Sequence, residues 1–273
     1  MSEGQAHIFQ IVYSEQTRKM LDPGFLPLDN VDNERPDWRE YWPIRRFLSS
    51  TELREGEFYG FFSPRFKEKT GLSSEEVRRF IHADYDVISF SHFFDQSCAF
   101  MNLFEQGEAH HEGFFALAQR FFDAIGYNLQ LHQLVMDSRQ IIFSNYFVAK
   151  SAFWREWFLL TEKLFQVAEQ GPAGALREDL NASAAHGVLR VPAKVFIMER
   201  IASLMLATQH GWRIKPYNTF SLPASPLPIS NFRLELVILD ALKIAHNTTR
   251  HPQYVRAFAD FREHLFRRVK ARP

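Results

Sequence analysis

Apolar residues recur along this chain with two periods, and residues 141–168 show both of them. Residues 141–148, IIFSNYFV, are rich in β-branched and aromatic side chains, which is typical of a buried strand. After a candidate N-cap at Ser151, largely apolar side chains from Trp154 to Ala168 recur at helical spacing. We therefore predict a strand followed by a helix, and we place this unit at the centre of the fold.

The rest of the chain alternates in the same way between short apolar runs and amphipathic stretches. Further strands are predicted at residues 7–13, 57–63, 84–90 and 212–217. Helices are predicted at residues 37–48, 73–82, 114–125, 127–137, 191–208 and 232–245, with a last one after Pro252. Loops are predicted at residues 21–36, 171–185 and 221–230, where turn-forming and small residues gather.

This order of elements predicts the fold class. Strands that alternate with helices are typical of an α/β protein with a mixed, mainly parallel sheet flanked by helices. The length of 273 residues suits one large domain. We expect a single domain over residues 1–273, with C-terminal helices at 230–270 packed on it. Gly60, in the middle of the predicted strand 57–63, indicates a bulge or a close approach of another backbone.

Composition excludes several classes of protein. A formal net charge of zero gives no basic field, so we do not expect nucleic-acid binding. A single cysteine, Cys98, excludes an intrachain disulfide and a multi-cysteine zinc site. No apolar run reaches membrane-spanning length and the N-terminus lacks a signal-peptide pattern, which predicts a cytoplasmic protein. The basic end RRVKARP suits a helix C-terminus, with peripheral contact to the inner face of a membrane as the alternative.

Several polar residues stand where ligands are commonly bound. Ser14 follows the first predicted strand, and open α/β sheets bind ligands beyond the carboxyl ends of their strands. Trp42 and Arg45 lie in an aromatic and cationic segment that would suit a nucleotide diphosphate. The other interpretation of this segment is a packed helix with solvated arginines.

Three aspartates are candidate ligands for Mn²⁺ or Mg²⁺, which prefer hard oxygen donors beside phosphate. Asp84 and Asp86 form a D-x-D at the start of a predicted strand, whereas metal carboxylates of sugar-nucleotide enzymes normally follow the strand. Asp95 lies on the expected side of that strand but has no second carboxylate nearby in the sequence.

Two further groups of residues could carry chemistry. Residues 105–112, EQGEAHHE, offer carboxylates and imidazoles for a metal or a general base, or form a solvated helix end. Glu199 and Arg200 interrupt a strongly apolar helix, where a carboxylate is costly unless it is paired or faces a wet cleft. Glu199 is therefore either a base at the site or a partner that fixes the helix. No GxGxxG, P-loop or G-x-S-x-G motif is present, which disfavours dinucleotide enzymes, kinases and serine hydrolases.

Four segments, taken in order, resemble a known family over roughly residues 8–208. They are HIFQIVYS, GEFYGFFSPRF, EQGEAHHEGFFALAQRFF, and SNYFVAK with FWREW followed by FIMERIASLMLAT. The resemblance is to a bacterial family of capsular and exopolysaccharide glycosyltransferases with a GT-A-like domain. The chain departs from the family pattern in two places. It has Ser14-Glu15-Gln16 where the family has a histidine, and Phe62-Ser63-Pro64-Arg65 where the family has H-Y-R-R.

The resemblance implies a GT-A-like sugar-nucleotide fold and transfer of a sugar from a nucleotide-diphosphate donor to a bacterial surface glycan. The acceptor would be a glycan or a lipid-linked sugar of a capsule, exopolysaccharide or lipopolysaccharide. Glu199 and His110 are the candidate bases, and Arg65, Arg45 or Lys150 would neutralise the leaving diphosphate with or without a divalent metal. The expected binding residues are Ser14, Trp42, Arg45, Arg65, Gln106, His111, Asn145, Lys150 and Arg200.

Two other functions fit the same residues. A degenerate transferase would bind a glycan or a partner protein without catalysis, and the position of the D-x-D favours it. An unrelated α/β enzyme would use the cluster at residues 105–111 to hold a metal.

Overall fold

A six-stranded sheet runs through the molecule in the order β2-β1-β3-β5-β4-β8. The strands are β1 (Ala6–Val12), β2 (Leu26–Asp29), β3 (Phe58–Phe62), β4 (Val87–Ser89), β5 (Phe147–Lys150) and β8 (Ile214–Pro216). β5 is antiparallel to β3 and β4, and the other neighbouring strands are parallel. The start of β5 therefore lies at the same edge of the sheet as the ends of the other strands. This computed structural model describes residues 5–186 and 189–271.

Helices cover both faces of the sheet. The longer ones are α2 (Tyr41–Ser50), α7 (Phe114–Ala124), α8 (Ser151–Gln170), α11 (Ile201–Thr208), α12 (Arg233–Thr249) and α13 (Pro252–Lys270). The shorter ones are α1 (Glu15–Lys19), α3 (Phe66–Thr70), α4 (Ser74–Phe80), α5 (Phe94–Ala99), α6 (Leu103–Glu108), α9 (Ala175–Asn181) and α10 (Ala193–Met198). Single 3₁₀ turns are η1 (Pro36–Trp38), η2 (Leu131–Gln133), η3 (Thr219–Ser221) and η4 (Pro228–Asn231). β6 (Ser183–His186) and β7 (Leu189–Pro192) form a separate antiparallel hairpin.

Alternate residues of the strands enter two different cores, as the period of two requires. Phe61 and Phe147 face a large cluster that also contains Trp154 and Trp157 of α8. Phe62 and other residues of the opposite face join a smaller cluster with Phe66 of α3, and the Phe62 and Phe66 rings stack at 4.1 Å. The sheet is thus buried on both sides, which confirms the predicted α/β class and the mixed, mainly parallel sheet.

The predicted central unit is confirmed in its helix and shortened in its strand. In α8, Trp154, Trp157 and Leu164 are fully buried. Lys150 is the N-cap and Ser151 is the first helical residue, one position from the prediction. The strand begins only at Phe147, because residues 141–146 turn through Ser144 and Asn145, which both have positive φ.

Several predicted boundaries are wrong. Residues 127–137 contain only the turn η2, and the predicted loops at 21–36 and 171–185 contain β2, α9 and β6. The apolar stretch at 191–208 is two helices, α10 and α11. They separate because the Arg200 guanidinium donates to the Phe196 carbonyl at 2.7 Å, while the Arg200 N–H bonds the Ile197 carbonyl three residues back.

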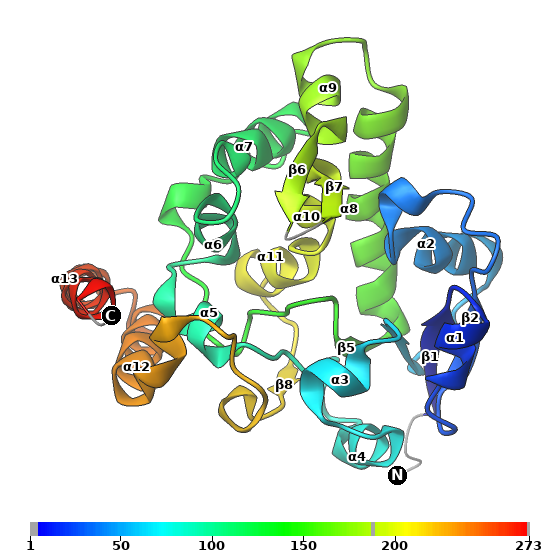
Figure 1. Cartoon of the computed structure of the whole chain (residues 1–273), viewed down its shortest axis with the longest axis horizontal. Coiled ribbons are helices and arrows are strands. Elements are labelled where there is room, and N and C mark those ends of the chain that lie inside the picture. The colour runs from blue at the N-terminus through cyan, green and yellow to red at the C-terminus, as the bar shows by residue number, and fades with distance from the viewer. Residues whose placement is uncertain (1–4, 187–188, 272–273) are drawn as a thin grey trace.

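The C-terminal helices α12 and α13 pack together at one end of the molecule (Figure 1). Their shared core includes Leu236, Leu239, Phe258 and Leu265, and it continues onto Cys98 of α5. Lys243 of α12 is buried and donates to the carbonyls of Ser97 and Phe100 at 2.5 and 2.9 Å. The pair is therefore attached to the single domain by both apolar packing and hydrogen bonds.

Candidate functional site

A polar pocket lies at the edge of the sheet where the parallel strands end. It has a volume of about 40 Å³. Its lining residues come from the segment before α2, the end of β3, α3, the turn before β5, and α10: Trp38, Arg39, Glu40, Tyr41, Ser63, Lys69, Ser144, Asn145, Val195, Met198 and Glu199. Sheets of this kind commonly bind ligands at this edge.

The backbone is strained around this pocket. Six non-glycine residues in the described part of the chain have positive φ, and three of them line the pocket. They are Arg39 with φ 49°, Ser144 with φ 57° and Asn145 with φ 52°. Such conformations cost free energy and concentrate at functional sites. The turn from 143 to 146 is held by Tyr146, whose backbone N–H bonds the Phe143 carbonyl at 3.2 Å.

Glu199 lies at the C-cap of α10, where the helix stops and turns toward the pocket. Burial raises the pKa of the Glu199 carboxyl, and the nearby Glu40 carboxylate raises it further. The cations Arg200, Lys69 and Arg39 only partly oppose this effect. Within the described residues no hydrogen bond or ion pair reaches the Glu199 carboxylate. It is therefore available as a proton acceptor or as a hydrogen-bond partner for a ligand.

The pocket also contains a buried acceptor that has no hydrogen-bond partner in the described part of the chain and a lysine that is already hydrogen-bonded. Asn145 is only 7% exposed, and its side-chain Oδ1 is buried without a hydrogen-bond partner among the described residues. Lys69 Nζ donates to Ser144 Oγ at 2.9 Å. Ser63 Oγ and the Tyr146 hydroxyl share a hydrogen bond of 2.6 Å. A buried acceptor that is left unsatisfied is costly, so a ligand hydroxyl or amine bound here would stabilise the site.

A buried lysine fixes the side of the pocket that carries Arg39 and Glu40. Lys194 of α10 is 1% exposed and pairs with Asp37 at 2.6 Å and Glu169 at 3.1 Å. It also donates to Asn181 at 2.7 Å and lies 4.3 Å from the Trp38 ring. Arg35 completes the network through Asp37 and Glu169, at 2.8 and 2.7 Å. These contacts connect η1, α8, α9 and α10.

Of the predicted site residues, the structure brings Asn145 and Glu199 together in this pocket. Lys150 lies at the end of β5, which is the opposite edge of the sheet. Asp86 lies at that edge too, and pairs with Lys150 at 3.1 Å and Arg213 at 3.3 Å. Asp84 is exposed next to His82. The structure therefore separates Lys150 and the D-x-D from the pocket.

Arg200 and its neighbours form a buried network beside α10. The Arg200 guanidinium donates to the Leu103 carbonyl at 2.8 Å and to Gln106 Oε1 at 2.9 Å. Desolvation lowers its pKa to about 10. Burial also lowers the pKa of His110, whose Nε2 lies 3.4 Å from Gln96 Oε1, and His111 stacks on Phe196 at 4.2 Å. In this structure Arg200, Gln106 and His111 hold α6 against α10.

The predicted donor-binding residues near the N-terminus make local contacts. Ser14 caps α1 and exchanges hydrogen bonds with Thr17. Arg45 forms an ion pair with Glu162 at 2.6 Å, and its guanidinium lies 4.0 Å from the Phe165 ring, on which Trp42 also stacks at 6.3 Å. Arg65 is exposed and pairs with Glu68 at 2.5 Å. None of these four residues lines the pocket.

The predicted metal carboxylates do not converge. Asp95 is 1% exposed, and it accepts hydrogen bonds from the Ser225 N–H at 2.9 Å and from the Ser225 hydroxyl. Asp84 and Asp86 lie at the other edge of the sheet. Among the described residues, no group of three or more His, Cys, Asp or Glu side chains could hold a metal ion. The three aspartates therefore do not fit a shared Mn²⁺ or Mg²⁺ site.

Sequence reasoning did not select Arg39, Glu40, Ser63, Lys69 or Ser144 of the pocket as site residues. Arg39, Glu40 and Lys69 lie in segments that look like ordinary charged helix ends, and Ser144 precedes the recognised Asn145. In the structure, Arg39 and Ser144 are distinguished by their positive φ. No residue pattern in the sequence predicts these dihedral angles.

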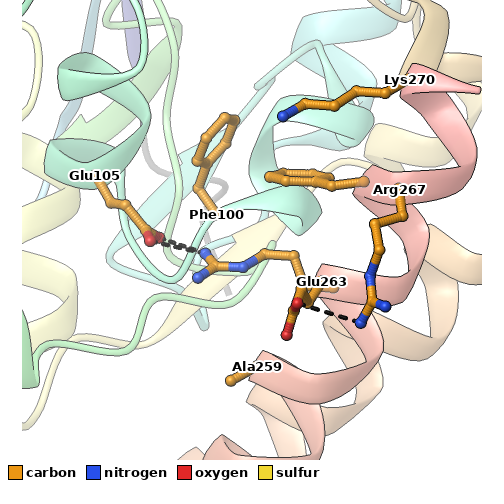
Figure 2. Close-up of a pocket in the computed structure, with 8 residues that line it drawn as sticks. Phe100, Glu105, Ala259, Glu263, Arg267 and Lys270 are labelled. Atoms are coloured by element: carbon orange, nitrogen blue, oxygen red, sulfur yellow. Dashed lines mark hydrogen bonds and ion pairs between the residues drawn. The ribbon is translucent and has the colours of Figure 1, made fainter.

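A second, wider concavity of about 560 Å³ lies between α13 and the start of α6 (Figure 2). Arg262 pairs with Glu105 at 2.8 Å, and Arg267 pairs with Glu263 at 3.2 Å; Figure 2 labels Glu105, Glu263 and Arg267. Lys270 and Phe100 line the same groove. Its arginines are already neutralised by carboxylates, and it lies away from the sheet edge.

No helix in the described residues combines the length and the apolar character needed to cross a bilayer. Comparison of the chain with protein-family models, with curated proteins and with solved structures found no match. The geometry of the pocket is therefore the basis on which a function is inferred.

Proposed function

We propose that this pocket is the catalytic centre of a glycosyltransferase that moves a sugar from a nucleotide-diphosphate donor to a bacterial surface glycan. The observation that carries the proposal is the Glu199 carboxylate, which has a raised pKa and no bonded partner among the described residues, facing a polar pocket at the carboxyl ends of the parallel strands. A perturbed carboxyl in such a place is a candidate general base. The GT-A-like resemblance noted in the sequence points to the same chemistry.

In the proposed reaction each group of the pocket has a separate task. Glu199 takes the proton of the acceptor hydroxyl as the acceptor oxygen bonds to the anomeric carbon. The bond from that carbon to the diphosphate oxygen breaks, and the diphosphate leaves with the electron pair. Arg39 and Lys69 neutralise the charge that develops on the leaving group. Asn145 Oδ1 accepts a hydrogen bond from a sugar hydroxyl and orients the ring.

The size of the pocket restricts how the donor binds. A volume of about 40 Å³ is far below the roughly 300–1,000 Å³ of usual ligand sites. In the proposal, the reacting end of the sugar enters, the nucleotide lies outside, and the turn at Ser144 and Asn145 moves to admit the donor. The same small volume favours the second candidate, a degenerate transferase that binds a glycan or a partner protein without catalysis.

Thermal shift against a panel of nucleoside diphosphates and their sugars, with and without Mn²⁺, tests binding. A ligand specific for the native state raises the melting temperature by mass action. We expect one nucleotide sugar to raise it, and the same donor to be hydrolysed slowly without acceptor. Donor binding without hydrolysis or transfer would favour the degenerate module. A flat panel would contradict the transferase and would favour a module that binds a glycan or a partner protein instead of a nucleotide sugar.

Glu199→Gln tests the catalytic role. We expect donor hydrolysis and transfer to fall by about 10²–10⁴-fold, the usual contribution of a general base, while the donor-induced thermal shift stays near that of the wild type. The ligand-free melting temperature at pH 7 should rise, because a neutral amide avoids burying a charge. Glu156→Gln, at an exposed carboxylate of α8, is the control. Unchanged turnover in Glu199→Gln, or loss of folding and binding together, would overturn the role.

A further inference from the structure

An uncovered apolar stripe runs along the outward face of α12. Leu234 is 71% exposed, Val237 42% and Ile238 37%. These residues stand at i, i+3 and i+4, so they share one face of the helix. Ala241 and Ala245 continue the stripe for two further turns. The stripe carries no charged residue over these positions.

The other face of α12 is already occupied. Leu236 and Leu239 are buried in the core that α12 shares with α13 and α5. The buried side also holds Asp240 and Lys243, so the helix is not apolar all round. A contiguous exposed apolar face on a helix normally packs against another surface, and no described residue covers the stripe. It is therefore a surface suited to an external partner.

The charged residues of α12 that are exposed and have no ion pair with another described residue are cations. α12 lies wholly within the described residues and has two carboxylates. Glu235 pairs with Arg268 at 2.7 Å, and Asp240 is 6% exposed and accepts hydrogen bonds from Ser138. Arg233 begins the helix and Arg250 follows it, both exposed and without an ion pair in the described part of the chain.

The C-terminal end of α13 lies beside the start of α12, at one end of the stripe. The Arg268–Glu235 ion pair, and the Arg268 guanidinium 5.2 Å from the Phe232 ring, place the end of α13 beside the beginning of α12. Lys270, two residues further on, is exposed but lines the groove between α13 and α6. Arg233 and Arg250 therefore place a cation at each end of the stripe, and α12 contributes no exposed, unpaired carboxylate.

We propose that α12 docks on an anionic lipid bilayer and lies in the plane of its interface, with Leu234, Val237 and Ile238 inserted among the acyl chains. Interfacial helices combine such an apolar face with flanking cations that meet anionic headgroups. The charge pattern disfavours a second copy, because a two-fold interface through this face would bring like-charged groups together without exposed carboxylates of α12 to pair them. A single convex helix also offers no groove for a partner helix.

This inference does not depend on the proposed transferase activity. Vesicle co-sedimentation tests it with the full chain and two kinds of vesicle, phosphatidylcholine alone and phosphatidylcholine mixed with phosphatidylglycerol. We expect binding to the mixed vesicles that weakens as salt is raised. Leu234→Glu with Ile238→Glu should weaken this binding at least tenfold, because each substitution places a charge where the proposal inserts an apolar side chain among the acyl chains. Arg233→Glu with Arg250→Glu should weaken it and reduce its salt dependence.

Leu159→Glu is the matched control, since Leu159 of α8 is 61% exposed but lies away from α12. Circular dichroism and melting temperature establish that each variant folds. Equal loss of vesicle binding in Leu159→Glu, or no preference for the anionic vesicles, would contradict the proposal. So would dimerisation in sedimentation velocity that Leu234→Glu abolishes, because the stripe would then be covered by a second copy.

Discussion

At the residue scale, two buried polar side chains near the carboxyl edge of the sheet lack hydrogen-bond partners among the described residues. Asn145 lines the pocket, and its Oδ1 is buried without a partner in the described part of the chain. His92 is 1% exposed, and neither of its ring nitrogens is bonded. Its ring packs 5.6 Å from Tyr146 and 6.0 Å from Phe143, the residues that flank the strained turn. Both side chains cost free energy in the ligand-free protein, which is typical of a region adapted to function rather than to stability.

Substitution of His92 should make the protein less sensitive to acid. Burial, with a smaller effect from Lys69, lowers the pKa of His92 from 6.5 to about 3. The unfolded chain therefore binds a proton between these values that the folded protein does not, so stability is lost as the pH falls from about 6.5 toward 3. We expect His92→Leu to raise the melting temperature, and to raise it more at pH 4.5 than at pH 7.5. His264→Leu, at an exposed histidine of α13, is the control. A gain independent of pH would contradict this account.

The site residues that could be predicted from the sequence are those whose polar side chain is unusual among its sequence neighbours. Asn145 and Glu199 were recognisable because each is a polar side chain inside an apolar run, where burial demands a reason. Arg39 and Lys69 left no such signal, because they lie in charged segments and reach the pocket only through the tertiary fold. Lys150 and Asp86 were expected at the site, but the direction of β5 and the start of β4 place them at the far edge.

At the scale of elements, apolar periodicity predicted which segments form helices and strands better than where they end. The apolar face of α8 is a local pattern and is confirmed. The helix expected from residue 73 begins at Ser74 as α4, where Ser73 and Glu76 form a capping box. The break between α10 and α11 was not predictable, because the Arg200 side chain that takes the Phe196 carbonyl is itself held by Gln106 and Leu103 from another helix.

Gly60 tests how closely the central strands are packed. A Cβ atom at this position would lie 2.8 Å from Val148 Cγ2 and 3.3 Å from the Phe147 carbonyl, across the β3–β5 pair. Overpacking of this kind costs about 1–3 kcal/mol, so we expect Gly60→Ala to lower the free energy of unfolding by that amount in urea denaturation. Gly174→Ala, where no atom lies within 4 Å, is the control. Equal stability of the two variants would show that β3 and β5 separate without cost.

At the scale of the whole molecule, the Lys194 network connects segments that are far apart in sequence. Asp37 precedes α2, Glu169 lies in the last turn of α8, and Lys194 lies in α10, 157 positions after Asp37 in the sequence. The network therefore joins the N-terminal part of the pocket, with Arg39 and Glu40, to the helix that carries Glu199. Loss of one partner should affect both the stability of the fold and the geometry of the pocket.

Asp37→Asn tests this connection through acid unfolding. Burial raises the pKa of Asp37, but hydrogen bonds from Arg35 and Lys194 outweigh it and hold the pKa at about 2, below the ordinary 3.8. A carboxylate with a depressed pKa stabilises the fold above the unfolded value, and this stability is lost as the pH falls from about 4 to 2. We therefore expect Asp37→Asn to melt at a lower temperature than the wild type at pH 7, with the difference shrinking toward pH 2. Asp32→Asn, at an exposed carboxylate, should follow the wild-type curve.

If the network also positions Arg39 and Glu40, Asp37→Asn will reduce the donor-induced thermal shift at pH 7 as well. A lower melting temperature with an unchanged donor shift would limit the network to stability.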